Sequence, residues 1–125
     1  MTGKAASARL GADGESAAAR LMESQGMKIA ARGFRTRNGE IDIIARDGKT
    51  LVFAEVKTRS YSAFGGPALA VTKSKQDKIT ACAVEYLKTL PTLPDSVRFD
   101  VIAITHGGEP QHIKDACRDF FKMSW

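Results

Sequence analysis

The feature that most constrains the fold of this sequence is an amphipathic hairpin pattern over residues 39–57. Successive side chains of a β-strand point to opposite faces, so the pattern can be sorted into two sets. One face carries apolar residues: Ile41, Ile43, Ala45, Val52, Ala54 and Val56. The other face carries charged residues: Glu40, Asp42, Glu55 and Lys57. The apolar face predicts packing on a core, and the charges predict a function on the other face.

The turn of this hairpin decides how the two central acids, Asp42 and Glu55, meet. A two-residue turn at Asp47-Gly48 would leave the two acids as diagonal neighbours, roughly 7 Å apart. A turn centred on Gly48-Lys49 would place them directly opposite each other, at about 5 Å. Both registers keep the two carboxylates on one face, whereas an odd-length loop would mix apolar and charged residues on both faces.

Two neighbouring carboxylates repel each other unless a proton, a cation or open water intervenes. Oxygen ligands suit hard divalent ions, so the pair predicts a site for Mg²⁺ (or Mn²⁺) at Asp42 and Glu55. Lys57 follows Glu55 by two residues and therefore lies on the same side of the strand. There it would orient a water molecule or stabilise charge on a phosphoryl oxygen.

The spacing of the remaining apolar residues predicts one domain over residues 13–125 after a flexible arm of residues 1–12. Helices are expected from Asp13 to Gly26 and from a Thr72 cap to just before Pro91. Strands are expected at 27–34, on both arms of the hairpin, at 97–104 and at 111–113, with a loop over 60–71. Helix, three strands, helix and strand make an α/β layout with a mixed sheet and helices on both faces.

Several segments together resemble a known family. Asp42 followed by Glu55-Val56-Lys57 resembles the PD-(D/E)xK nuclease signature, with Ile41 in place of the proline. The YraN family (UPF0102-type), small bacterial proteins predicted to be endonucleases similar to archaeal Holliday-junction resolvases, has similar segments in the same order. In this chain they are Gly14-Glu15, Gly39-Glu40-Ile41-Asp42, Phe53-Ala54-Glu55-Val56-Lys57-Thr58-Arg59, Lys75-Gln76 and Arg98-Phe99-Asp100-Val101. The chain departs from that family at Gly33, commonly asparagine, and at Ala54, commonly valine.

This resemblance implies a restriction-endonuclease-like αβββαβ core and a metal-dependent endonuclease that hydrolyses DNA phosphodiester bonds, with branched DNA as one candidate substrate. Asp42, Glu55 and the carbonyl of Val56 would hold the Mg²⁺. Lys57 would act on the attacking water, and Glu15 would complete the site. Glu15 is also consistent with an ordinary acid in the first turn of a helix.

A nucleic-acid partner is expected from the formal charge of +5 and the pI near 9.4. Candidate phosphate contacts, which are equally consistent with a solvated surface, are Arg35, Arg37, Lys73, Lys75, Gln76 and Lys78. Asp100 is expected to anchor a basic residue, and His106 and His112 are expected at the surface. Cutting a junction would require two active sites, so a homodimer is one expectation.

The sequence carries no secretory signal and no membrane-length apolar stretch, which favours a cytoplasmic protein. Cys82 and Cys117 lack the spacing of a zinc site, so two reduced thiols are expected. Two rival functions remain open. One is a non-catalytic nucleic-acid-binding module with a nuclease-like fold, and the other is a protein-interaction adaptor that uses the basic surface.

Overall fold

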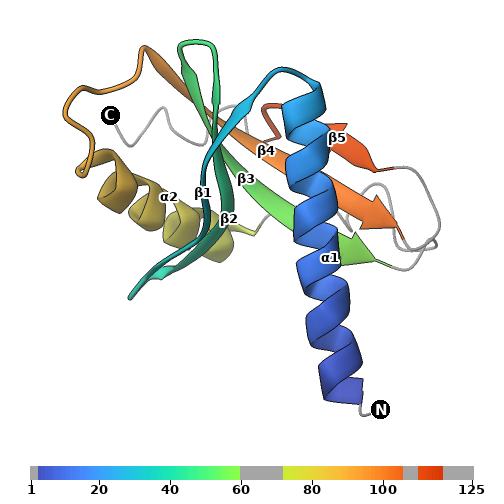
Figure 1. Ribbon diagram of the computed structural model, residues 1–125. Coiled ribbons are helices and arrows are strands. Elements are labelled where there is room, and N and C mark those ends of the chain that lie inside the picture. The colour runs from blue at the N-terminus through green and yellow to red at the C-terminus, as the bar shows by residue number, and fades with distance from the viewer. Residues whose placement is uncertain (1–2, 60–71, 106–109, 117–125) are drawn as a thin grey trace.

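A computed structural model of the chain describes residues 3–59, 72–105 and 110–116, which form a five-stranded sheet flanked by two helices (Figure 1). The elements in chain order are α1 (Gly3–Ser24), β1 (Lys28–Thr36), β2 (Gly39–Asp47), β3 (Thr50–Arg59), α2 (Lys73–Leu87), β4 (Ser96–Thr105) and β5 (Gln111–Ile113). The strands lie in the order β1-β2-β3-β4-β5, with β3 and β4 parallel and the other neighbours antiparallel. The predicted αβββαβ order and mixed sheet are confirmed.

Helix α1 begins at Gly3, whereas the sequence analysis expected it at Asp13. The segment taken for an arm contains alanine, lysine, arginine and leucine, which are good helix formers, so the helix continues through it. The predicted C-terminal stop is confirmed. Gly26 adopts a φ of 92°, and the Met27 amide donates to the carbonyl of Met22 at 3.1 Å, which closes the helix end.

The turn between β2 and β3 is the second of the two predicted alternatives. Asp47 pairs with Thr50, so Gly48 and Lys49 are the two central residues. Gly48 has a φ of 62°, the left-handed conformation that a two-residue hairpin needs and that glycine adopts without strain. Continued by one residue, this register places Asp42 directly opposite Glu55, as the second alternative predicted.

The two faces of the sheet carry separate apolar clusters, one under each helix. The cluster under α1 contains Ala18, Ala19, Met22, Met27, Ile43, Ala45, Val52, Ala54 and Ile102. The cluster under α2 contains Ile41, Ile44, Leu51, Phe53, Ile79, Cys82, Ala83, Leu87, Phe99 and Val101. The predicted single apolar face is therefore wrong in part, because the second face is also apolar near the turn. Glu55 and Lys57 lie on that face farther from the turn.

Ile41 was expected beside Ile43, yet it packs in the cluster under α2. The neighbouring strand β1 changes face at the same level. Arg32 pairs with Ile43 and bonds to α1, but Phe34, which pairs with Ile41, packs in the α2 cluster. Gly33 lies between them with a φ of 62°, a left-handed conformation that glycine adopts without strain. The regular alternation of faces is thus interrupted beside Asp42.

Helix α2 is the predicted crossover between the parallel strands β3 and β4. The Oγ1 of Thr72 accepts a hydrogen bond from the Lys75 amide at 3.2 Å, which confirms the predicted cap. The expected loop over 60–71 lies outside the described residues. Within those residues, no helix is both long and apolar enough to cross a membrane.

Candidate functional site

The candidate site lies where β2 and β3 part. Their described pairing runs from Asp47–Thr50 to Ile43–Ala54, whereas β3 continues beside β4 as far as Arg59. Asp42 is the next residue of β2 in this register, and Glu55 is the next residue of β3. The Oδ2 of Asp42 accepts a hydrogen bond from the Val56 amide at 2.8 Å. The Val56 amide thus bonds to a side-chain oxygen of Asp42. Asp42 and Glu55 are neighbours where the β2–β3 pairing ends.

The surroundings of Asp42 disfavour its negative charge. Burial is the largest cause, and the nearby carboxylates of Glu55, Glu15 and Glu40 add to it. The hydrogen bond from the Val56 amide opposes them. Together these effects raise the pKa of Asp42 from 3.8 to about 6. A cation placed among these acids would reverse the effect, because it would favour the ionised form.

Glu55 is held by one oxygen only. Its Oε1 forms an ion pair with the Nζ of Lys75 from the first turn of α2, and its side chain is 12% exposed. Its Oε2 is buried and has no hydrogen-bond partner among the residues that the structure describes. Leaving a buried carboxylate oxygen without a partner is costly, so this atom suits coordination by a cation.

The donor set fits Mg²⁺ or Mn²⁺ as a site of two carboxylates. No three His, Cys, Asp or Glu side chains gather into a metal-binding group within residues 14–58, 72–104 and 110–116. Mg²⁺ commonly uses one or two carboxylates and keeps several waters, so two acids and a backbone carbonyl are sufficient. Asp42, Glu55 and the carbonyl of Val56 could supply these oxygens.

Lys57 and Glu15 flank this pair. Lys57 follows Glu55 by two residues on β3, and it is 8% exposed. A buried ammonium group is stable only when it is paired with acids or hydrogen-bonded. Glu15 comes from α1 and is held by the Nε of Arg32 at 3.3 Å. Its carboxylate is close enough to act on Asp42, but it is already paired with a base.

A close approach of α1 to β3 brings Glu15 to this site. The neighbouring Gly14 is buried, and a Cβ atom at that position would lie 2.7 Å from the Oγ1 of Thr58. Any larger residue would therefore push the helix away from the strand. Glycine at this position lets the helix contact the strand that carries Glu55 and Lys57.

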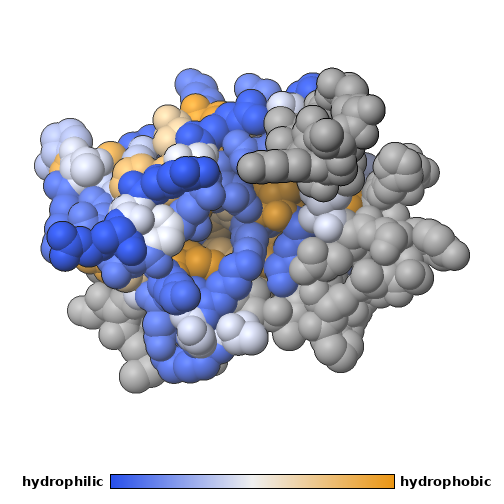
Figure 2. Space-filling model, turned by 90° about the horizontal axis from the view of Figure 1, so that it is seen from below, coloured by the Kyte–Doolittle hydropathy of each residue, from blue (hydrophilic) through white to orange (hydrophobic). Residues whose placement is uncertain are grey.

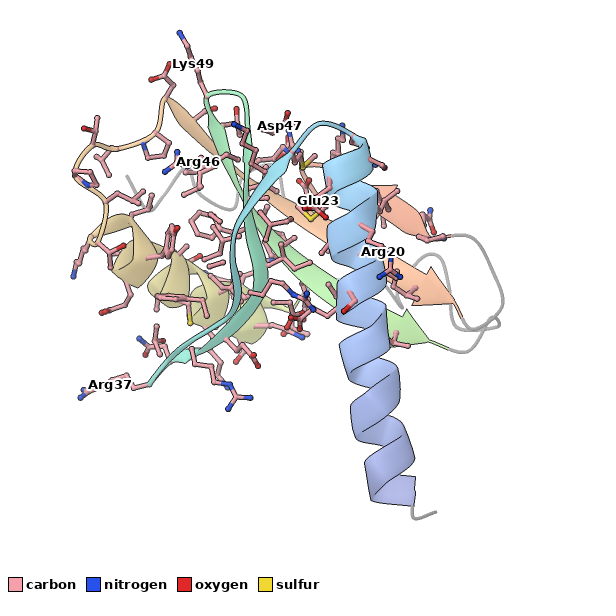
Figure 3. All side chains as sticks on the ribbon, in the orientation of Figure 1. Arg20, Glu23, Arg37, Arg46, Asp47 and Lys49 are labelled. Carbon is pink, nitrogen blue, oxygen red and sulfur yellow. The ribbon has the colours of Figure 1, made fainter. Side chains whose placement is uncertain are left out.

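The candidate nucleic-acid residues occupy two elements that pack together. Lys73, Lys75, Gln76 and Lys78 lie on the first turns of α2, whereas Arg35 and Arg37 lie at the end of β1 and in the turn that follows. Arg37 projects from the tip of the β1–β2 hairpin (Figure 3). The Oγ1 of Thr36 lies 3.1 Å from the Sγ of Cys82, so this hairpin end contacts α2.

Some of these basic side chains are already paired with acids. Arg35 pairs with Glu40 at 3.5 Å, and Lys73 pairs with Asp77 at 2.6 Å. A groove of about 480 Å³ lies beside Arg35 and Arg37. Its lining residues are Phe34, Arg35, Thr36, Arg37, Glu85 and Thr89. Hydrophilic residues cover most of the coloured surface in Figure 2, with hydrophobic residues in the recesses between them. The coloured part of this face is therefore largely polar.

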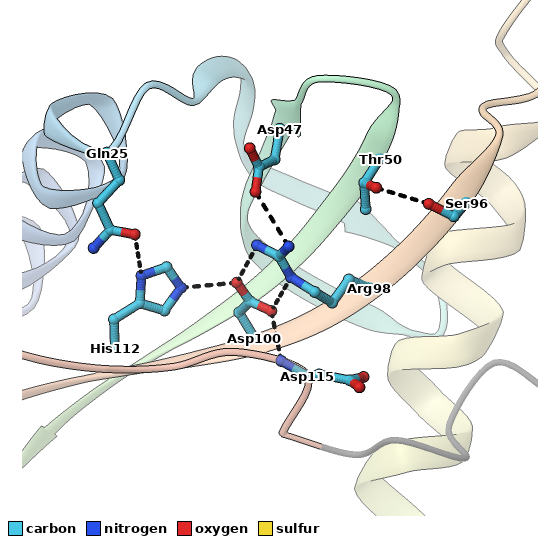
Figure 4. Close-up of polar contacts among 8 residues, drawn as sticks. All are labelled: Gln25, Asp47, Thr50, Ser96, Arg98, Asp100, His112 and Asp115. Atoms are coloured by element: carbon cyan, nitrogen blue, oxygen red, sulfur yellow. Dashed lines mark hydrogen bonds and ion pairs between the residues drawn. The ribbon is translucent and has the colours of Figure 1, made fainter.

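A second polar cluster, which the sequence predicted only in part, surrounds Asp100 on β4 (Figure 4). Asp100 is fully buried and accepts two hydrogen bonds from Arg98, one from the Asp115 amide and one from the Nε2 of His112 at 2.7 Å. Burial works against the charge of Asp100, but these donors outweigh it and lower its pKa. The predicted role of Asp100 as an anchor for a basic residue is confirmed.

His112 was expected at the surface, and this expectation is wrong. Its side chain is 5% exposed, and its Nδ1 lies 3.1 Å from the Oε1 of Gln25. Arg98 and Asp100 stand two residues apart on one strand, and this spacing is the sequence signal for the pair. Nothing local to His112 indicates its contact with α1, because Gln25 is 87 residues away in sequence. His106, the other histidine expected at the surface, lies outside the described residues.

Comparison with known proteins places the chain in a family. The profile described as "Uncharacterised protein family UPF0102" matches residues 14–104, which include the acid pair, Arg98 and Asp100. A UPF0102 protein of Rhodococcus jostii is 50% identical over 111 residues, covering 86% of this chain and 94% of that protein. One of Geobacter metallireducens is 51% identical over 110 residues, covering 86% of this chain and 90% of that protein. The chain therefore belongs to the UPF0102 family, as its resemblance to the YraN (UPF0102-type) proteins predicted.

Proposed function

We propose that this protein is a metal-dependent nuclease that hydrolyses DNA phosphodiester bonds. One observation carries the proposal: Asp42 and Glu55 meet where β2 and β3 part, and within the described part of the chain the Glu55 Oε2 is buried without a hydrogen-bond partner. The raised pKa of Asp42 supports it, because acids crowded in this way favour a bound cation.

Each residue of the site has a proposed role. Asp42, Glu55 and the carbonyl of Val56 would hold Mg²⁺ or Mn²⁺, which when bound polarises a phosphate and lowers the pKa of a coordinated water. Lys57 would orient the attacking water or neutralise charge on a phosphoryl oxygen. Glu15, held in place by Arg32, would complete the acidic surroundings.

The substrate would approach over the basic residues of α2 and the β1–β2 hairpin. Phosphate contacts are proposed for Arg35, Arg37, Lys73, Lys75, Gln76 and Lys78. Branched DNA is the substrate favoured by the resemblance to junction resolvases. A homodimer would supply the two active sites that symmetrical cutting of a junction requires.

A second candidate function is a nucleic-acid-binding module without catalytic activity. The ion pair between Lys75 and Glu55 favours this alternative, because it already neutralises one of the acids without a metal. The two functions share the basic surface and differ only in chemistry.

Labelled linear, single-stranded, flap and four-way-junction DNA, incubated with Mg²⁺, Mn²⁺ or EDTA, would separate these functions. The nuclease proposal predicts cleavage of at least one substrate with Mg²⁺ or Mn²⁺ and none with EDTA. DNA binding that weakens with salt, without cleavage of any substrate in either metal, would favour the binding module. Undetectable binding would favour a protein-interaction adaptor.

A further inference from the structure

Lys75 occupies an unusual place for a surface lysine. Its Nζ pairs with the Glu55 Oε1, while the other lysine of the first turn of α2, Lys73, turns to Asp77 on its own helix. The Lys75 side chain is 49% exposed, whereas that of Glu55 is 12% exposed. The Lys75 side chain is thus partly exposed to solvent while its ammonium group contacts Glu55.

The position of Lys75 on α2 strengthens its hold on Glu55. The first turn of α2 contains no acidic residue that could compete for it. A lysine ammonium is a compact charge on a flexible stem, so it can change partner without movement of the helix.

The Lys75 Nζ contacts one of the two oxygens that a cation on Glu55 would use. A divalent ion and an ammonium group at one carboxylate would repel each other at short range. Binding of the ion would therefore weaken the Lys75–Glu55 pair. The nearest new partner of suitable charge for Lys75 would be a phosphate of the bound DNA.

We propose that Lys75 is an internal counter-ion, which neutralises Glu55 while the metal is absent and moves to a DNA phosphate when a divalent ion binds. The inference rests on the proposed function and deepens it. By linkage, metal and DNA strengthen each other's binding, because each one favours the released position of Lys75. Lys75 is thus a positioning residue that couples the two ligands.

The first test is Mn²⁺ binding by the full chain, measured calorimetrically for wild type, Lys75→Gln and the matched control Lys73→Gln. Lys75→Gln is expected to bind Mn²⁺ about 3- to 10-fold more tightly than wild type, since the competing cation is gone. Lys73→Gln, with the same loss of charge, is expected to stay within about twofold. Lys75→Arg, which retains a cation, is expected to remain near wild type.

Equal Mn²⁺ affinity in wild type and Lys75→Gln would overturn the inference and leave the nuclease proposal standing. Absence of Mn²⁺ binding in every variant would overturn both. A gain in Lys73→Gln as large as in Lys75→Gln would show a general charge effect and would also overturn the inference.

The second test is DNA affinity with Ca²⁺, a hard oxygen-seeking cation, and with EDTA. In EDTA, Lys75 is engaged by Glu55, so Lys75→Gln is expected to weaken DNA binding by less than about twofold. With Ca²⁺, the released lysine contacts DNA, and the same change is expected to weaken binding about 3- to 10-fold. Losses in Lys75→Gln that are the same in Ca²⁺ and EDTA would contradict the coupling.

Discussion

The raised pKa of Asp42 predicts that this residue lowers the stability of the metal-free protein at neutral pH. Its folded pKa of about 6 lies above the ordinary 3.8, so the folded protein binds more protons than the unfolded chain between about pH 4 and pH 6. Stability therefore falls as the pH rises through this window, and the cost is fully present above pH 6. A bound cation would offset this cost.

Asp42→Asn should consequently stabilise the metal-free protein at pH 8, because an amide carries no charge and can still accept from the Val56 amide. A pKa rise from 3.8 to about 6 corresponds to about 3 kcal/mol, which partial exposure reduces to roughly 1–2 kcal/mol. Urea unfolding at pH 8 and pH 4 would measure the gain, which should shrink at the lower pH. A variant less stable than wild type at pH 8 would contradict this account.

Asp100 is the opposite case, a buried acid whose charge is fully compensated. Asp100→Asn should destabilise the fold by about 2 kcal/mol, because Arg98 would lose one of its two carboxylate partners and keep only Asp47 at 3.1 Å. The folded pKa lies below 3.8, so the contribution of Asp100 is present above about pH 4 and is lost as the pH falls through that lower value. Thermal unfolding would measure the loss, with the exposed Asp95→Asn as control. Similar melting temperatures for both variants would argue against a structural role.

At the scale of elements, the close contact between α1 and β3 sets the position of the site. Gly14→Ala places a Cβ atom 2.7 Å from the Thr58 Oγ1, so it should destabilise the protein by about 1–2 kcal/mol despite the higher helix propensity of alanine. In a Thr58→Ala background the same change should cost much less, because the clashing oxygen is absent. A double-mutant cycle by urea unfolding measures this coupling. If the losses in unfolding free energy simply add, Gly14 of α1 and Thr58 of β3 are not coupled, which would contradict this account.

The element order could be predicted from sequence because its signals are local. Alternating residues predicted β2 and β3, the Thr72 cap predicted the start of α2, and Gly26 predicted the end of α1. The early start of α1 was missed because its small residues suit both a helix and an arm. Ile41 packs in the cluster under α2, and this change of face occurs beside Gly33 of the neighbouring strand β1. The residue pattern of β2 alone cannot show it.

The candidate site was predictable only in part. Alternation brought Asp42 and Glu55 together, and the turn left two registers between which the structure decides. The Lys75–Glu55 pair joins residues on separate elements, so sequence spacing gave no indication of it. The partner of His112 was missed for the same reason. Contacts between elements distant in sequence require the tertiary structure.

At the scale of the whole molecule, the net charge of +5 matters through its distribution. Arg37 and Lys78 are exposed and lie on the hairpin end and α2 that pack together. Reversing both to glutamate should weaken DNA binding at least about 10-fold and flatten its salt dependence, since fewer counterions are released. Fluorescence anisotropy over a salt series would measure both effects.

The matched control reverses Arg20 and Lys49, which are also exposed and lie on other parts of the molecule (Figure 3). The control has the same net charge as the test variant. Equal losses in the two variants would mean that DNA binds through overall charge, and the proposed surface would be wrong.

The most direct test of the central claim is single-turnover cleavage of a labelled four-way junction with Mg²⁺ by wild type, Glu55→Gln and Glu85→Gln. Glu85 is an exposed acid of α2, so its change matches the charge loss away from the acid pair. The account predicts cleavage by wild type and Glu85→Gln, and a loss of at least about 100-fold in Glu55→Gln with DNA binding retained. Cleavage by Glu55→Gln at the wild-type rate would contradict it.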